Sequence, residues 1–151
     1  MTQPQEQALN YFFVHVFNQI MACEEQALKN IGAKDLSVKE LHVLEAVNDL
    51  SQEDRNTMSQ IADALSIRVS SLTAAVNTLV RKGYLERSGE PHDRRVIRIW
   101  LTSKGKEAND HHARFHGSMV ESAASRLDEE ELDILLRSLD GLNHFFREMH
   151  R

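Results

Sequence analysis

Apolar residues recur at helical spacing along most of the chain, and this pattern predicts a mainly α-helical protein. Between residues 5 and 30 they fall three or four positions apart, which predicts one long amphipathic helix. Ser37 followed by Glu40 resembles a capping box and opens a second helix that runs to Leu50. Four further helices are expected over residues 57–65, 69–82, 102–126 and 128–151.

The spacing changes to the alternation typical of β-strands between the fourth and fifth predicted helices. Two short runs, 84–87 and 96–101, are expected to be strands, and segment 88–93 contains the Gly and Pro of a turn. The two preceding helices are joined by a tight turn at residues 66–68. Two short helices followed by a β-hairpin form a winged helix-turn-helix, a fold class that is mainly α with a small β-wing.

The helix predicted at residues 69–82 has the character of a recognition helix. Its outward face carries short hydroxyl groups and one amide, which can approach base edges in the major groove. Arg68 lies just before this helix, within reach of a phosphate or a guanine. Capping of the helix is the alternative role for one of the hydroxyls. The DNA contacts expected from this element are Arg68, Ser70, Ser71, Thr73 and Asn77.

The predicted wing places three further candidates at its tip: His92, Arg94 and Arg95. An arginine at this position fits a narrow minor groove, where the negative potential is enhanced. Asp93 is acidic within a basic hairpin, and we expect it to pair with Arg95 and stiffen the turn. Arg94 is then the expected minor-groove residue.

Charge is distributed unevenly along the chain. Residues 66–106 contain nine Lys and Arg against three acids, which gives this segment a charge of +6. The whole chain carries −5, so the remaining residues carry −11. A basic module attached to an acidic body is typical of a protein that neutralises phosphates at one face.

Length and composition favour one cytoplasmic domain. The chain has 151 residues, 41% of them hydrophobic, and no apolar run of the roughly 20 residues that a membrane helix needs. The N-terminus does not resemble a signal peptide, and no motif of an enzyme active site occurs. The only cysteine, Cys23, precedes two glutamates that disfavour a thiolate, so a peroxide-sensing role is a weaker alternative.

The wing region resembles the MarR family of bacterial transcriptional regulators. The resemblance rests on Asp93-Arg94-Arg95 followed by Leu101-Thr102-Ser103-Lys104-Gly105, and the order of helices matches over nearly the whole chain. It implies a single domain over 1–151 that forms an intertwined homodimer and binds pseudo-palindromic double-stranded DNA. It further implies a dimerisation region built from 1–36 and 102–151 and a DNA-binding lobe over 37–101.

Within the family, several short segments resemble the FabT-like branch, which represses fatty-acid biosynthesis genes. These segments are Phe17-Asn18, Glu24-Glu25, Lys39-Glu40-Leu41-His42, Arg81-Lys82-Gly83-Tyr84 and Arg114-Phe115-His116. The resemblance implies control of fatty-acid biosynthesis, with acyl carrier protein bearing a long acyl chain, or a small molecule, as the effector.

Four residues form a candidate metal site: Glu24, His42, His112 and His116. The last two are four residues apart on one predicted helix and therefore share a face. Glu24 lies on the apolar stripe of the first helix, where a carboxylate needs a partner. Three imidazoles and one carboxylate can bind zinc tetrahedrally. A hydrogen-bonded cluster without metal is the alternative.

The same four positions resemble the zinc ligands of the streptococcal zinc-uptake repressor, another MarR member. The second metal site of that repressor is not reproduced, because Asn30 and Leu41 stand where Cys and Glu would be expected. The fatty-acid branch resembles this chain at the same four positions, so these residues do not decide between a lipid-responsive and a zinc-responsive repressor. A helical adaptor that binds no DNA is the hypothesis of a different class, and it would lack salt-sensitive DNA binding.

Overall fold

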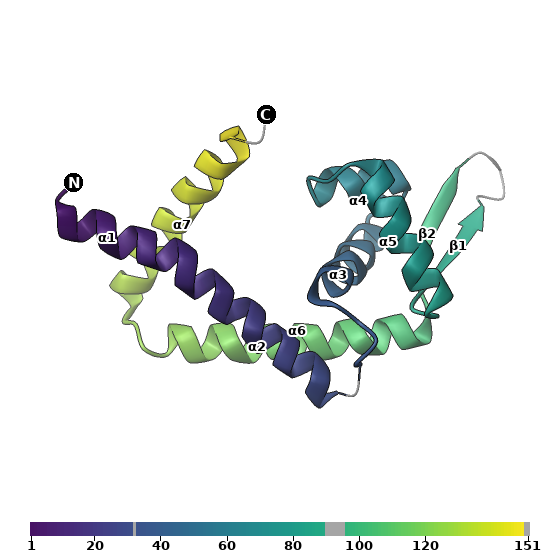
Figure 1. Ribbon diagram of the computed structural model, residues 1–151, viewed down its shortest axis with the longest axis horizontal. Coiled ribbons are helices and arrows are strands. Elements are labelled where there is room, and N and C mark those ends of the chain that lie inside the picture. The colour runs from purple at the N-terminus through teal and green to yellow at the C-terminus, as the bar shows by residue number, and fades with distance from the viewer. Residues whose placement is uncertain (32, 90–95, 150–151) are drawn as a thin grey trace. The chain divides into compact units, whose positions relative to one another are not determined.

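The computed structural model describes residues 1–31, 33–89 and 96–149, which are mainly helical with one two-stranded antiparallel sheet (Figure 1). The predicted class, mainly α with a small β-wing, is confirmed. In chain order the elements are α1 (Gln3–Tyr11), the π-helical segment η1 (Phe12–Val16), α2 (Phe17–Asn30), α3 (Val38–Gln52), α4 (Met58–Ala64), α5 (Val69–Arg81), β1 (Leu85–Gly89), β2 (Ile97–Leu101), α6 (Ser103–Ala124) and α7 (Glu129–Met149).

The chain forms two compact units, Met1–Ala113 and Arg114–Arg151. The first unit contains the elements from α1 to β2 and the beginning of α6. The second contains the end of α6 and all of α7, and Asp128 and Glu131 form a capping box at the start of α7. The predicted division into a dimerisation region (1–36 and 102–151) and a DNA-binding lobe (37–101) stays a prediction.

The first predicted helix is present but is not a uniform α-helix. It begins at Gln3, earlier than expected, because Thr2 and Gln5 form a capping box. Its middle, η1, has π-helical hydrogen bonding over Phe12–Val16. A π-helical turn inserts one residue and shifts the faces of the helix on either side. The apolar spacing predicted a helix here but did not distinguish this local hydrogen-bond pattern.

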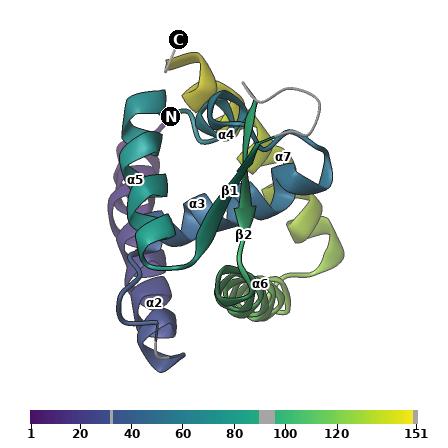
Figure 2. The ribbon, with the colours of Figure 1, turned by 90° about the vertical axis from the view of Figure 1, so that its right-hand side faces the viewer.

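The core of the first unit lies between α3, α4, α5 and the hairpin (Figure 2). The apolar spacing of α5 predicts a buried stripe of Leu72, Ala75, Val76 and Leu79. Leu72, Val76 and Leu79 are fully buried, and Ala75 is half-buried. Ile99 of β2 is buried on the facing strand. This packing leaves the opposite side of α5 exposed. Among the described residues, no helix is both long and apolar enough to cross a membrane.

The hairpin differs from its predicted bounds. Strand β1 begins at Leu85 and reaches Gly89, pairing from Leu85↔Leu101 to Gly89↔Ile97. Tyr84 was expected in the strand, but its amide closes the end of α5 by donating to the Leu79 carbonyl at 2.9 Å. Gly83 has φ of +79°, as expected for the glycine that ends a helix. Residues 90–95 at the turn lie outside the described residues.

The junction between the hairpin and α6 explains the Leu-Thr-Ser-Lys-Gly sequence. The Thr102 hydroxyl accepts a hydrogen bond from the Gly105 amide at 3.1 Å and donates to the Gly83 carbonyl at 2.6 Å. A Cβ atom at Gly105 would lie 2.1 Å from the Tyr84 carbonyl oxygen. Glycine is therefore required at position 105 for α6 to begin this close to the hairpin.

Candidate DNA-binding surface and metal-ligand cluster

The predicted recognition-helix residues gather on one exposed side of α5. Arg68 is the N-cap of the helix, and Ser70, Ser71 and Asn77 are exposed. Thr73 is half-buried, and its hydroxyl donates to the Val69 carbonyl at 2.8 Å. A hydroxyl that donates within its helix can still accept from a base or a phosphate-bound water. Contact of these residues with DNA stays a prediction.

The wing-tip candidates His92, Arg94 and Arg95 lie outside the described residues, and so does the expected pair between Asp93 and Arg95. The described base of the wing is fixed through Asn56, which is fully buried. Its amide donates to the Ile99 carbonyl at 2.7 Å and accepts from Arg98 at 3.0 Å. Arg98 also donates to the Asp54 carbonyl. Arg98 is therefore a structural cation of the basic segment.

Lys82, at the C-terminal end of α5, has a partner inside the protein. Its ammonium group contacts both carboxylate oxygens of Glu40, at 2.8 and 2.9 Å, and donates to the Asp35 carbonyl. Glu40 also accepts from the Ser37 amide at 2.8 Å in the capping box of α3. Burial raises the pKa of Glu40, but the contacts with Lys82 and Ser37 outweigh it and hold the pKa below its usual value.

Lys104 and Tyr84 complete this polar network around Asp35. The Tyr84 hydroxyl donates to Asp35 at 2.8 Å, and the Lys104 ammonium lies 3.6 Å from the same carboxylate. The hydrogen bond from Tyr84, together with Lys104, lowers the pKa of Asp35. Burial and the Asp35 contact raise the pKa of Tyr84. These contacts were not predicted, because they join residues more than forty positions apart and no local pattern indicates them.

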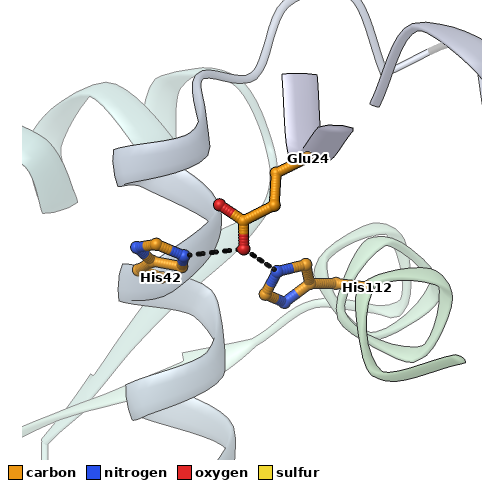
Figure 3. A group of neighbouring side chains, drawn as sticks. All are labelled: Glu24, His42 and His112. Atoms are coloured by element: carbon orange, nitrogen blue, oxygen red, sulfur yellow. Dashed lines mark hydrogen bonds and ion pairs between the residues drawn. The ribbon is translucent and has the colours of Figure 1, made fainter. Parts of the chain in front are cut away.

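Glu24, His42 and His112 converge from α2, α3 and α6 (Figure 3). The Nε2 atoms of both histidines lie 3.4 Å from the same oxygen, Oε1 of Glu24. Glu24 is 2% exposed and His112 is 4% exposed. The structure thus brings together three of the four residues proposed from the sequence. His116 follows one turn later on α6 in the second unit, and its part in the cluster stays a prediction.

Two of the donor separations in the cluster fit a zinc ion. One donor atom from each residue lies within 4.8 Å of the others. Donors about 2.0–2.2 Å from a tetrahedral zinc lie roughly 3.3–3.6 Å from one another. The two 3.4 Å separations match that spacing, whereas they are long for hydrogen bonds. Glu45 was not predicted, but its carboxylate lies 3.9 Å from His112 Nδ1, on the side where a metal-bound histidine typically faces a carboxylate.

A surface hollow of about 480 Å³ is lined by residues from the end of α2, the start of α3 and the segment between them. Its floor is formed by buried apolar residues, and its lining also includes Lys29, Lys34 and Glu25. Its volume falls in the range of small-ligand sites. The apolar floor with cationic side chains is chemically suited to an anion with an apolar body.

Apolar side chains are exposed on the helices at both ends of the chain. On the N-terminal run Phe17 is 62% exposed, and Phe13 and Ile20 are 37% exposed. On α7, Leu135, Leu139 and Phe146 are each 41% exposed. Exposed faces this apolar usually mark an interaction surface.

Comparison with known proteins gives matches over most of the chain. The profile of the MarR family matches residues 34–96. The chain is 31% identical over 131 residues to the uncharacterized HTH-type transcriptional regulator YpoP of Bacillus subtilis, covering 85% of this chain and 86% of YpoP. It is 29% identical over 126 residues to the transcriptional regulator AdcR of Streptococcus pneumoniae, covering 82% and 86%.

Among solved structures, Streptococcus pneumoniae FabT in complex with DNA matches with a TM-score of 0.85 and 33% sequence identity. The match covers 95% of this chain and 99% of the FabT chain. The elements α4, α5 and the β1–β2 hairpin therefore belong to a fold that is known in a DNA-bound state.

Proposed function

Because this chain belongs to the MarR family of DNA-binding transcriptional regulators, we propose that it is a repressor of fatty-acid biosynthesis genes. Its relatives are transcriptional regulators, which confirms the expectation that it is not an enzyme. The observation that supports the gene target is the similarity to FabT over nearly the full length of both chains. A regulator of chromosomal genes acts in the bacterial cytoplasm.

The DNA-binding mode follows from the exposed face of α5 and from the wing. A homodimer presents two recognition helices, so the operator is expected to be a pseudo-palindrome with half-sites about one helical turn apart. Titration of the protein against promoters of fatty-acid biosynthesis genes and against unrelated DNA tests the proposal. Specific binding that weakens steeply with salt is expected. Equal affinity for both classes of DNA would contradict the proposed target.

The dimer is expected to use the exposed apolar faces of the N-terminal helices and α7. Removal of residues 128–151 deletes the whole of α7 with its exposed leucine and phenylalanine side chains, which include Leu135, Leu139 and Phe146. The truncated chain is expected to be insoluble or unfolded, which expression and size-exclusion chromatography can measure. A soluble, folded monomer would show that α7 is not needed for the dimer or the core.

The effector is expected to report on lipid synthesis. Acyl carrier protein bearing a long acyl chain, added to the DNA titration, should change operator affinity, whereas the unloaded carrier protein should not. The test is the comparison of loaded with unloaded carrier, and a change in operator affinity of either sign that only the loaded carrier produces supports the proposal. A smaller amphiphilic effector is the alternative, and the hollow beside Lys29 and Lys34 is the candidate place for it.

The second candidate function is a zinc-responsive repressor, and the Glu24–His42–His112 cluster favours it. Zinc would be held by these three side chains, with His116 as the fourth ligand proposed from the sequence. Bound zinc would supply a fixed bond between α2, α3 and α6 in place of two long polar contacts. Such a bond constrains α3, which packs against α5 and so influences the recognition helix.

Elemental analysis and isothermal titration with zinc test this candidate. His112→Ala should abolish zinc binding, because it removes a buried donor. His144→Ala is the matched control, since His144 is exposed on α7 and pairs with Glu148. If zinc neither binds the purified protein nor alters its DNA affinity, the cluster is a hydrogen-bonded contact between α2, α3 and α6 that holds no metal.

A further inference from the structure

One contact links the recognition helix directly to the wing. Arg87 of β1 donates from Nη2 to Oδ1 of Asn77 on α5, at 2.5 Å. Both residues are exposed, and both lie in the segment expected to face DNA. The guanidinium group of arginine has only N–H donors and no acceptor. The amide atom that faces Arg87 must therefore be the oxygen, and the orientation of the Asn77 amide is fixed by its chemistry.

Because its oxygen accepts from Arg87, the Asn77 amide presents its NH₂ group for binding to DNA. Its Nδ2 hydrogens make no hydrogen bond to any of the residues that the structure describes. A 180° rotation of the amide would place its NH₂ group against the guanidinium, donor against donor. Arg87 thus holds the amide in one orientation. The remaining N–H groups of Arg87 can bind a phosphate, which would brace it further when DNA is present.

We propose that Arg87 is a positioning residue that determines base specificity by holding the Asn77 amide with its NH₂ group presented to DNA. An NH₂ group bonds acceptor atoms on a base edge, such as N7 and O6 of guanine, N7 of adenine or O4 of thymine. It does not bond N4 of cytosine, which is a donor. Asn77 therefore discriminates against a donor edge at one base pair in each half-site. This inference rests on the proposed role of α5 as the recognition helix.

The test begins with an operator selected from random DNA by the full-length protein, so that it does not depend on the fatty-acid target. Every base pair of one half-site is replaced in turn by the other three, and affinities are measured for the wild type and Asn77→Ala. The position read by Asn77 is the one at which the wild-type preference collapses in Asn77→Ala. A preference of roughly tenfold is expected there. Replacing the purine by its 7-deaza analogue should weaken binding of the wild type but not of Asn77→Ala when N7 is the acceptor.

Arg87→Met should relax the preference at this same base pair while leaving the preferences at other positions unchanged. Arg87→Lys retains a donor and should keep part of the discrimination. Arg81→Met is the matched control. Arg81 is an exposed cation on α5, and its guanidinium contacts Thr78 and not Asn77. This substitution should weaken binding to all sequences equally.

Two results would overturn the inference. An equal loss of affinity for every base pair in Arg87→Met would make Arg87 a phosphate contact alone. An unchanged preference profile in Asn77→Ala would mean that Asn77 contacts no base. Failure to select any operator would instead refute sequence-specific DNA binding, the premise from which the proposed function starts.

Discussion

Replacing Lys82 by methionine tests whether the polar network under the recognition helix controls stability. Methionine keeps most of the length and apolar stem of lysine but removes the ammonium group that contacts Glu40 and the Asp35 carbonyl. The side chains of Lys82 and Glu40 are 26% and 14% exposed, so the pair is neither fully buried nor fully solvated.

The magnitude follows from this intermediate burial. Exposed ion pairs contribute about 0–1 kcal/mol, and breaking a buried pair costs about 3–5 kcal/mol. Glu40 keeps its hydrogen bond from the Ser37 amide after the substitution. We therefore expect Lys82→Met to lower the free energy of unfolding by about 1.5–3 kcal/mol. Lys39→Met, on the exposed first turn of α3, should change it by less than about 0.5 kcal/mol.

The assay is urea unfolding at fixed protein concentration, with Glu40→Gln and the double variant completing a double-mutant cycle. The pKa of Glu40 lies below its ordinary value of 4.5, so the pair stabilises the protein fully above that pH. Its contribution is lost as pH falls through the lowered pKa. The difference between wild type and Lys82→Met should thus be constant from pH 7 to about 5 and shrink in more acidic solution.

The reasoning is refuted if the two substitutions are additive at pH 7, because the pair would then contribute nothing. DNA binding gives an independent check. A lysine that contacts phosphate contributes about 0.9 to the slope of log affinity against log salt. Lys82→Met should leave this slope unchanged, since the ammonium group is bound inside the protein. A reduced slope would identify Lys82 as a phosphate contact.

Three further substitutions and one control probe the fold and the wing. Gly105→Ala should lower the melting temperature strongly, because its Cβ meets the Tyr84 backbone at 2.1 Å, whereas Gly117→Ala in the same helix has no atom within 4 Å and should be neutral or stabilising. Asn56→Ala should cost about 1–3 kcal/mol in urea unfolding, since it leaves the buried Ile99 carbonyl without its amide donor. Arg94→Ala should weaken operator binding by about 1–3 kcal/mol in a fluorescence titration, and unchanged affinity at moderate salt would remove the wing tip from the recognition model.

Local sequence signals predicted the elements well. The capping boxes at Ser37 and Asp128 and the glycine after α5 are formed by residues close in sequence, so their side chains reveal the helix ends. The apolar stripe of α5 is buried as expected. The π-helical turn was not predicted, because its residues have the same composition and spacing as an α-helix. The change appears only in the hydrogen-bond pattern.

Tertiary polar contacts were predicted only where a single residue conflicted with its surroundings. Glu24 is a carboxylate on an apolar stripe. This conflict, the shared face of His112 and His116 and the resemblance to the zinc-uptake repressor predicted a cluster of Glu24 with His42, His112 and His116, and the structure brings His42 and His112 to Glu24. Lys82 and Arg87 looked like ordinary cations of a basic surface, and nothing in their neighbours indicated that they bind Glu40 and Asn77. A favourable exposed charge carries no sequence signal that it has an internal partner.

Helix α3 connects the candidate metal cluster to the recognition helix within one turn. Glu40, which holds Lys82 at the end of α5, and His42, which contacts Glu24, are two residues apart. Leu41 between them is 1% exposed and fixes this turn in the core. A shift of the first turn of α3 must therefore change both contacts together. If the cluster binds a ligand that tightens it, we expect the effect to reach α5 through this turn of α3, because buried packing resists continuous deformation.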